Sequence, residues 1–155
     1  MGGAASTRAS KQGAKRMSDS VGAGPLVKVG ATASLTRTVT EDDVQRFAEA
    51  TGDRNPVHLD SEAAAASVFG RRVAHGMLSA SLISAVLGTK LPGPGTIYLS
   101  QSVRFRGPVF LGDTVTASVT VTAIDLERSH CVLETSVHNE SGDTVLDGEA
   151  RVRLP

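Results

Sequence analysis

Residues 76–87 form the segment that most restricts how this chain can fold, because small or apolar side chains lie on almost every side of the helix they predict. A helix without a polar face has to be buried against other elements. Because the side chains of its serines and alanines are small, the backbone of neighbouring elements can approach this helix closely. Gly88 stands at a natural C-cap position. We therefore expect one central helix surrounded by the rest of the domain.

The chain beyond this helix has the composition and periodicity of β-strands. Residues 114–124 alternate strictly, with Val and Ala on one face and Thr and Ser on the other. Including an edge strand ahead of the helices, the expected strands are 26–38, 96–106, 114–124, 129–139 and 144–154. The short turn at 140–143 joins the last two and predicts antiparallel pairing.

Two shorter helices are expected before the central one. Thr40 is a predicted N-cap followed by acidic residues, and an amphipathic stripe runs from Val44 to Thr51 and ends at Gly52. Residues 53–59 are expected to be a loop, and residues 61–67 a short Ala-rich helix. This order predicts an α+β fold, in which a single antiparallel sheet wraps around the central buried helix.

Length and composition restrict the domain organisation. The 155 residues suffice for one domain, which we assign to residues 25–155, with residues 1–24 as a leader or disordered segment. The first 16 residues carry four basic and no acidic side chains, so an organellar transit peptide is the weaker alternative. A single Cys fits a reducing compartment, and we expect a cytoplasmic protein.

Two classes of partner are disfavoured by composition. Beyond residue 16 the chain has 12 basic and 16 acidic residues, and aromatics make up only 3% of the whole, which argues against nucleic-acid binding. No stretch approaches the roughly 18 continuous apolar residues of a membrane span, so no membrane partner is expected.

The densest polar cluster lies at residues 53–58, where Asp53 and His58 flank Asn55-Pro56. A carboxylate and an imidazole in one tight loop can hold and activate a water, sharing the general acid and base roles. The alternative from residue types alone is a turn capped by Asp53 and Asn55, with His58 incidental. Both interpretations remain open at this point.

A second cluster, His75-Gly76-Met77, stands directly at the start of the central helix. The unbonded N–H groups of a helix N-terminus can stabilise an oxyanion, and Gly76 allows a carbonyl to approach the backbone. The alternative is that Gly76 eases helix entry and His75 is a cap or a core histidine.

Together the two clusters resemble the signature of MaoC-like (R)-specific enoyl-CoA hydratases, which have the hot-dog fold. The similarity continues through Leu91-Pro92-Gly93, the run 97–102, and Pro108-Val109-Phe110 with Gly112-Asp113, so it spans about residues 36–155. The resemblance implies a single hot-dog domain. The implied activity is reversible syn addition of water to trans-2-enoyl-CoA, giving (R)-3-hydroxyacyl-CoA in fatty acid metabolism.

Carried over by position, the resemblance implies that Asp53 and His58 hold the attacking water and that the Gly76 N–H binds the thioester oxygen. Further substrate-binding residues are expected nearby, with Ser84 lining the site, Leu87 shaping an acyl tunnel, and Arg104 and Arg106 facing coenzyme A phosphates. The full substrate-binding set is Asn55, His75, Met77, Ser84, Leu87, Arg104 and Arg106. The two arginines equally suit a solvated strand face.

No metal site and no separate cofactor is expected, because coenzyme A enters as part of the substrate. His130, His138 and Cys131 are interpreted as strand and core residues. The family implies a homodimer joined through sheet edges. The alternatives are a hot-dog acyl-CoA thioesterase, a dehydratase acting on acyl-carrier-protein substrates, and a non-catalytic acyl-thioester-binding module. Acyl chain length and pathway are left open by the sequence.

Overall fold

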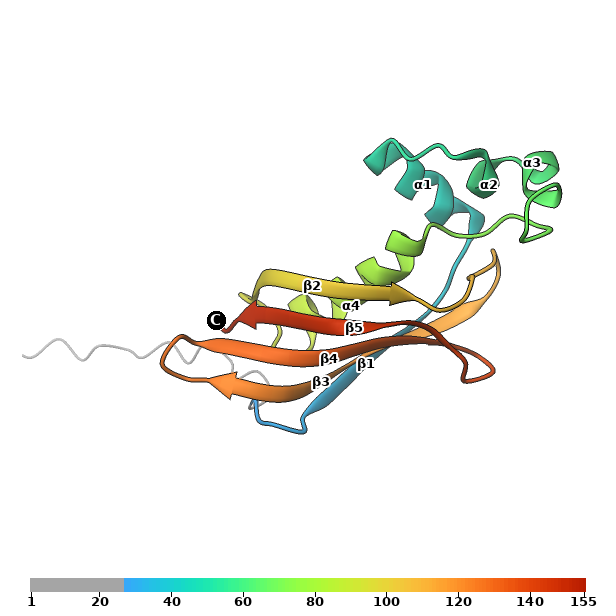
Figure 1. Ribbon diagram of the computed structural model, residues 1–155. Coiled ribbons are helices and arrows are strands. Elements are labelled where there is room, and N and C mark those ends of the chain that lie inside the picture. The colour runs from blue at the N-terminus through green and yellow to red at the C-terminus, as the bar shows by residue number, and fades with distance from the viewer. Residues whose placement is uncertain (1–26) are drawn as a thin grey trace, which may run out of the picture.

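The computed structural model describes residues 27–155, so the expectations for residues 1–24 lie outside the described residues, as does the first residue of the strand expected at 26–38. Five strands and four helices follow one another, with all the helices between the first and second strands (Figure 1). Their order is β1 (Thr32–Thr38), α1 (Glu41–Thr51), α2 (Pro56–Leu59), α3 (Ser61–Ala65), α4 (Gly76–Thr89), β2 (Ile97–Phe105), β3 (Thr114–Asp125), β4 (His130–Asn139) and β5 (Thr144–Arg153).

The five strands form one antiparallel sheet in the order β1-β3-β4-β5-β2, which puts β1 and β2 at its two edges. The helix α4 runs along one face of this sheet and contacts β1, β2, β3 and β4, while α1, α2 and α3 gather beyond one end of it (Figure 1). The predicted α+β architecture, a sheet around one central helix, is confirmed.

The core lies between α4 and the inner face of the sheet. Alternation on β3 brings Val115, Ala117, Val119 and Val121 inward, and all four are buried. Cys131 is buried on β4, as expected for a core residue. At Gly148 of β5 a Cβ atom would lie 1.8 Å from a backbone oxygen of β2, so the two strands approach closely only because this residue is glycine.

Several element boundaries differ from the sequence-based expectations. Gly88 does not cap α4, because the helix continues to Thr89 and the Lys90 N–H still donates to a helical carbonyl. Residues 53–59 are not all loop, since the fixed φ of Pro56 starts the one-turn helix α2. The helix expected at 61–67 stops at Ala65.

Burial of α4 is less complete than its apolar character predicts. Met77, Ser81, Ser84 and Gly88 are exposed, and their spacing places them on one stripe of the helix. The central helix is therefore buried on its sheet-facing side, and this one stripe stays uncovered in a single copy of the chain. Among the described residues, no helix has both the length and the apolar character needed to cross a membrane.

Candidate active site

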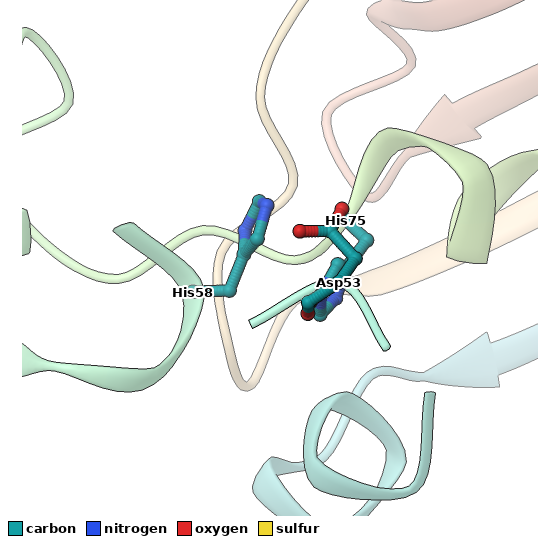
Figure 2. A group of neighbouring side chains, drawn as sticks. All are labelled: Asp53, His58 and His75. Atoms are coloured by element: carbon teal, nitrogen blue, oxygen red, sulfur yellow. The ribbon is translucent and has the colours of Figure 1, made fainter. Parts of the chain in front are cut away.

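Three side chains from three segments meet beyond the N-terminus of α4. Asp53 follows α1, His58 belongs to α2, and His75 is the residue just before α4 (Figure 2). Their nearest ligand-type atoms all lie within 4.8 Å of one another. Asp53 is exposed, His58 half-buried and His75 buried, so the group extends from the surface into the domain.

The local sequence explains how Asp53 and His58 come together. The Asp53 carboxylate accepts a hydrogen bond from the Asn55 N–H, and the Asn55 side chain accepts one from the Val57 N–H and so caps α2. The turn interpretation and the catalytic interpretation are thus compatible. The capped turn is what sets the spacing between the carboxylate and the imidazole.

A single hydrogen bond determines the tautomer of His58. Its Nδ1 lies 2.8 Å from the main-chain oxygen of Val73, and because a carbonyl only accepts, Nδ1 carries the proton. In the neutral ring Nε2 then holds a lone pair. His58 can therefore accept a proton at Nε2 and release it again.

His75 contacts both of the other members of the group. Its ring stacks on that of His58, with centroids 3.9 Å apart, and its Nε2 donates to the main-chain oxygen of Asp53 at 2.9 Å. His75 is 2% exposed, and its Nδ1 is buried without a hydrogen-bond partner. His75 is therefore buried, as the core-histidine interpretation expects. Its ring contact and its hydrogen bond also hold His58 and Asp53 in place.

The same three residues carry donor types that bind metal ions, and each histidine donates its other N–H to a carbonyl. Metal binding, however, requires lone pairs that converge on one point. The His58 and His75 rings lie against each other at an interplanar angle of 31°, and the Nδ1 lone pair of His75 is buried. The arrangement favours acid–base chemistry on a water held by Asp53 and His58.

A hollow of about 390 Å³ leads from His58 and Gly76 to the surface. As the first residue of α4, Gly76 directs its N–H away from the helix, where no carbonyl of an earlier turn accepts it. A Cβ at Gly76 would lie 2.8 Å from the Phe105 ring, so glycine leaves the backbone open to a ligand beside that ring.

The remaining expected substrate residues fall into three places. Met77 and Ser84 line a second, apolar hollow of about 470 Å³ between α1, α4 and β2. Leu87 is 1% exposed and packs in the core. Arg106 lines the first hollow and is paired with Asp147, whereas Arg104 lies in a separate hollow of the sheet beside Glu134 and Asp147. The structure does not bring Leu87 or Arg104 to the Asp53–His58 pair.

Sequence reasoning missed two residues that lie at the site. Arg72 donates from Nε to the main-chain oxygen of His58 at 2.8 Å and from Nη1 to Glu41 at 2.7 Å. Phe105 forms one wall of the first hollow. The sequence offered a weak signal for each residue. Arg72 belongs to a pair of arginines directly before an apolar pair, and Phe105 is one of only five aromatic residues in the chain.

Comparisons with known proteins agree with this geometry. A family model described as a MaoC like domain matches residues 26–142. The chain is 49% identical over 129 residues to an (R)-specific enoyl-CoA hydratase of Rhodospirillum rubrum, covering 83% of this chain and 89% of that protein. It is 35% identical over 145 residues to a mitochondrial 3-hydroxyacyl-[acyl-carrier-protein] dehydratase of Arabidopsis thaliana, covering 90% of this chain and 85% of that protein.

The solved structure of an (R)-hydratase from A. caviae, described as involved in PHA biosynthesis, superimposes with a TM-score of 0.81 at 45% identity. The match covers 84% of this chain and 98% of that one.

Proposed function

Because the chain belongs to the MaoC-like family, we propose that it is an (R)-specific enoyl-CoA hydratase, a hydro-lyase that reversibly adds water to trans-2-enoyl-CoA and gives (R)-3-hydroxyacyl-CoA. The observation that carries the proposal is the meeting of Asp53 and His58 with the N-terminus of α4. The named activities of the hydratase relatives support it.

The proposed reaction starts with polarisation of the thioester. The Gly76 N–H donates to the thioester oxygen, and this withdraws electrons from C3 of the enoyl chain. The Asp53 carboxylate orients a water, while Nε2 of His58 takes one of its protons as the water oxygen bonds to C3. The negative charge then rests on the thioester oxygen beside the helix N-terminus.

His58 completes the cycle by returning the proton to C2. One O–H bond of water and the π bond between C2 and C3 are broken, and one C3–O and one C2–H bond are formed. Because the same two side chains hold the water and move its proton, both new bonds form on one face of the double bond. No electron leaves the substrate, so the proposed chemistry needs no redox cofactor, and coenzyme A remains the carrier.

The experiment is a measurement of enoyl absorbance after adding the protein to crotonyl-CoA, with Asp53→Asn and His58→Gln as test variants. His138→Gln is the matched control, because His138 lies on β4, away from the site. We expect rapid loss of absorbance and (R) product with the wild type and the control, and at least a roughly hundredfold lower kcat in each test variant.

Each contrary result has a defined meaning. Release of thiol at constant enoyl absorbance would identify a thioesterase. Activity confined to crotonyl-carrier protein would identify a dehydratase of the kind named for the Arabidopsis relative. Full activity in either test variant would contradict the assigned catalytic pair.

We further propose that two copies of the chain pair through β2 to form a homodimer. β2 is an edge strand that carries the exposed apolar residues Ile97 and Leu99, and the exposed stripe of α4 that contains Met77 faces the hollow bordered by this strand. A second copy would cover this edge and the stripe.

Ile97→Glu combined with Leu99→Glu tests this pairing by light scattering after size exclusion. We expect a dimer for the wild type and a monomer for the variant. Leu126→Glu should remain a dimer, because Leu126 is 81% exposed in the β3–β4 turn. A monomeric wild type, or a dimeric double variant, would contradict the pairing.

Cytoplasmic location and a role in fatty acid metabolism are part of the same proposal. They are supported by the single cysteine, which fits a reducing compartment, and by the thioester chemistry of the relatives.

A further inference from the structure

A coenzyme A thioester that reaches Gly76 has to leave its phosphates somewhere beyond the mouth of the first hollow. We propose that Arg71 binds the phosphate at the far end of the pantetheine arm, an inference that rests on the proposed thioester chemistry. Sequence reasoning gave this role to Arg104 and Arg106, but the structure places a better candidate next to the mouth.

Two antiparallel segments connect the catalytic group with Arg71. Residues 69–74 and 107–111 are joined by the Ala74 N–H to Val109 oxygen bond of 2.7 Å and by a bridge between Val73 and Phe110. Both segments border the first hollow, and both also border a smaller one of about 240 Å³ that Arg71 lines. Phe69 lines the first hollow and Gly70, the next residue, lines the second, so this pair of segments runs from one hollow to the other.

The guanidinium of Arg71 is held in an orientation suited to a phosphate. Its Cζ lies 3.8 Å from the centroid of the Phe110 ring, and the residue is exposed. Stacking fixes the plane of the guanidinium and leaves its N–H edges available for planar, two-pronged recognition of phosphate oxygens. Among the described residues, no carboxylate forms an ion pair with it.

Three further arginines, Arg72, Arg104 and Arg106, are already engaged or lie elsewhere. Arg72 is bonded to Glu41 and to the backbone of His58. Arg106 makes two hydrogen bonds to Asp147, at 2.8 and 3.3 Å, which balance its charge. Arg104 shares its hollow with Glu134 as well as with Asp147. Of these four arginines, Arg71 is the one that lies beside the mouth without an ion pair to a described residue.

The separation of the two positions suits the ligand. Arg71 and Gly76 are five Cα-to-Cα steps apart along the chain, which span at most about 17 Å when extended. An extended pantetheine arm joins a thioester to its phosphate over a similar length. The chemistry recognised is a phosphate ester on pantetheine, which coenzyme A and a carrier protein share.

Steady-state kinetics on substrates of increasing length test the proposal. The substrates are crotonyl-pantetheine, which has no phosphate, crotonyl-CoA and crotonyl-carrier protein. For Arg71→Ala we expect kcat/KM on crotonyl-CoA to fall about tenfold or more, mainly through KM, and to stay unchanged on crotonyl-pantetheine. Arg71→Lys should recover part of the loss. Arg128→Ala is the matched control, because it removes an exposed arginine in the β3–β4 turn, and it should behave as the wild type on all three substrates.

The outcomes separate this inference from the proposed function. Equal losses on crotonyl-CoA and crotonyl-pantetheine would show a structural role for Arg71 and overturn the inference, as would no loss on any phosphorylated substrate. A loss confined to the carrier-protein substrate would also overturn it, because coenzyme A carries the same phosphate and Arg71 would then contact the carrier protein itself. If the wild type hydrates none of the substrates, the proposed function fails, and calorimetric binding of coenzyme A to wild type and Arg71→Ala still decides the role of Arg71.

Discussion

Arg72 links the first turn of α1 to the backbone of His58, through one hydrogen bond to Glu41 and one to the His58 carbonyl oxygen. Its side chain is only 14% exposed, and its Nη2 is buried without a partner. A buried donor without a partner lowers the stability of the fold. Stability alone therefore does not explain this buried arginine, whereas its two hydrogen bonds fix the position of His58 relative to α1. We interpret Arg72 as a positioning residue that acts through His58.

Replacing Arg72 by Met should lower kcat for crotonyl-CoA by about tenfold while leaving KM nearly unchanged. The reason is that the backbone of His58, which carries the imidazole, loses its support while the substrate contacts remain. Arg72→Lys keeps the charge opposite Glu41 and should recover part of kcat. The control is Arg46→Met, which removes an exposed ion pair on α1. Unchanged kcat in Arg72→Met, or a loss that follows the loss of thermal stability in both variants, would contradict the positioning role.

Gly76 is the second single position at which the structure predicts a catalytic effect. In Gly76→Ala the new methyl group meets the Phe105 ring, and because this side chain is 55% exposed, the ring can move aside. We expect the protein to fold, with kcat/KM at least about tenfold lower because the methyl and the displaced ring obstruct the approach to the N–H. Adding Phe105→Ala should restore part of the activity, and a double-variant cycle measures this coupling. If the kcat/KM of the double variant equals the product of the two separate effects, the two residues do not obstruct each other.

Among the elements, α1 owes its start to a capping box. The Thr40 hydroxyl accepts from the Asp43 N–H, and the Asp43 carboxylate accepts from the Thr40 N–H and pairs with Arg37. Burial acts to raise the pKa of Asp43, but the hydrogen bonds from Thr40 and Arg37 outweigh it and hold the pKa below its ordinary value of 3.8. Since the unfolded chain binds this proton more readily, the carboxylate stabilises the fold above pH 3.8.

We therefore expect Asp43→Asn to reduce the free energy of unfolding by about 1 kcal/mol at pH 7. This difference should shrink as the pH falls below 3.8 and through the lower pKa of the folded state, because the wild type then loses the same charge. Urea unfolding at several pH values measures it. Glu49→Gln, an exposed change on the same helix, should leave stability almost unaltered. A difference that stays constant across this pH range would rule out the charge as its cause.

The same elements show how far sequence reasoning reaches. Strict alternation predicted β3 correctly, because one face of that strand is buried along most of its length. The turn residues Asn55 and Pro56 predicted a bend but not α2, since four residues are too few to show a helical period. The role of Arg72 left no sequence pattern, because it bonds to a main-chain oxygen, and any residue type supplies one. Exposure along α4 was missed because small and apolar residues look the same in the sequence whether they are buried or exposed.

At the scale of the whole molecule, β4 is the central strand of the five-stranded sheet. β4 lies between β3 and β5, and Cys131 on this strand is fully buried. Burial raises the pKa of the Cys131 thiol, which disfavours the reactive thiolate. A reagent can therefore reach this sulfur only when the packing around β4 opens, and opening of a central strand is close to global unfolding.

Cys131 should accordingly react with a disulfide reagent at least about a thousandfold more slowly in the native protein than in urea. The matched control is Cys131→Ser combined with Ser141→Cys, which moves the thiol to the exposed β4–β5 turn and should react on mixing. If the chain forms the proposed dimer, protection of Cys131 should rise further with protein concentration, because association stabilises only the folded state. Reaction of native Cys131 as fast as that of the turn thiol would show that β4 opens locally, and the central strand would then not be the most stable part of the fold.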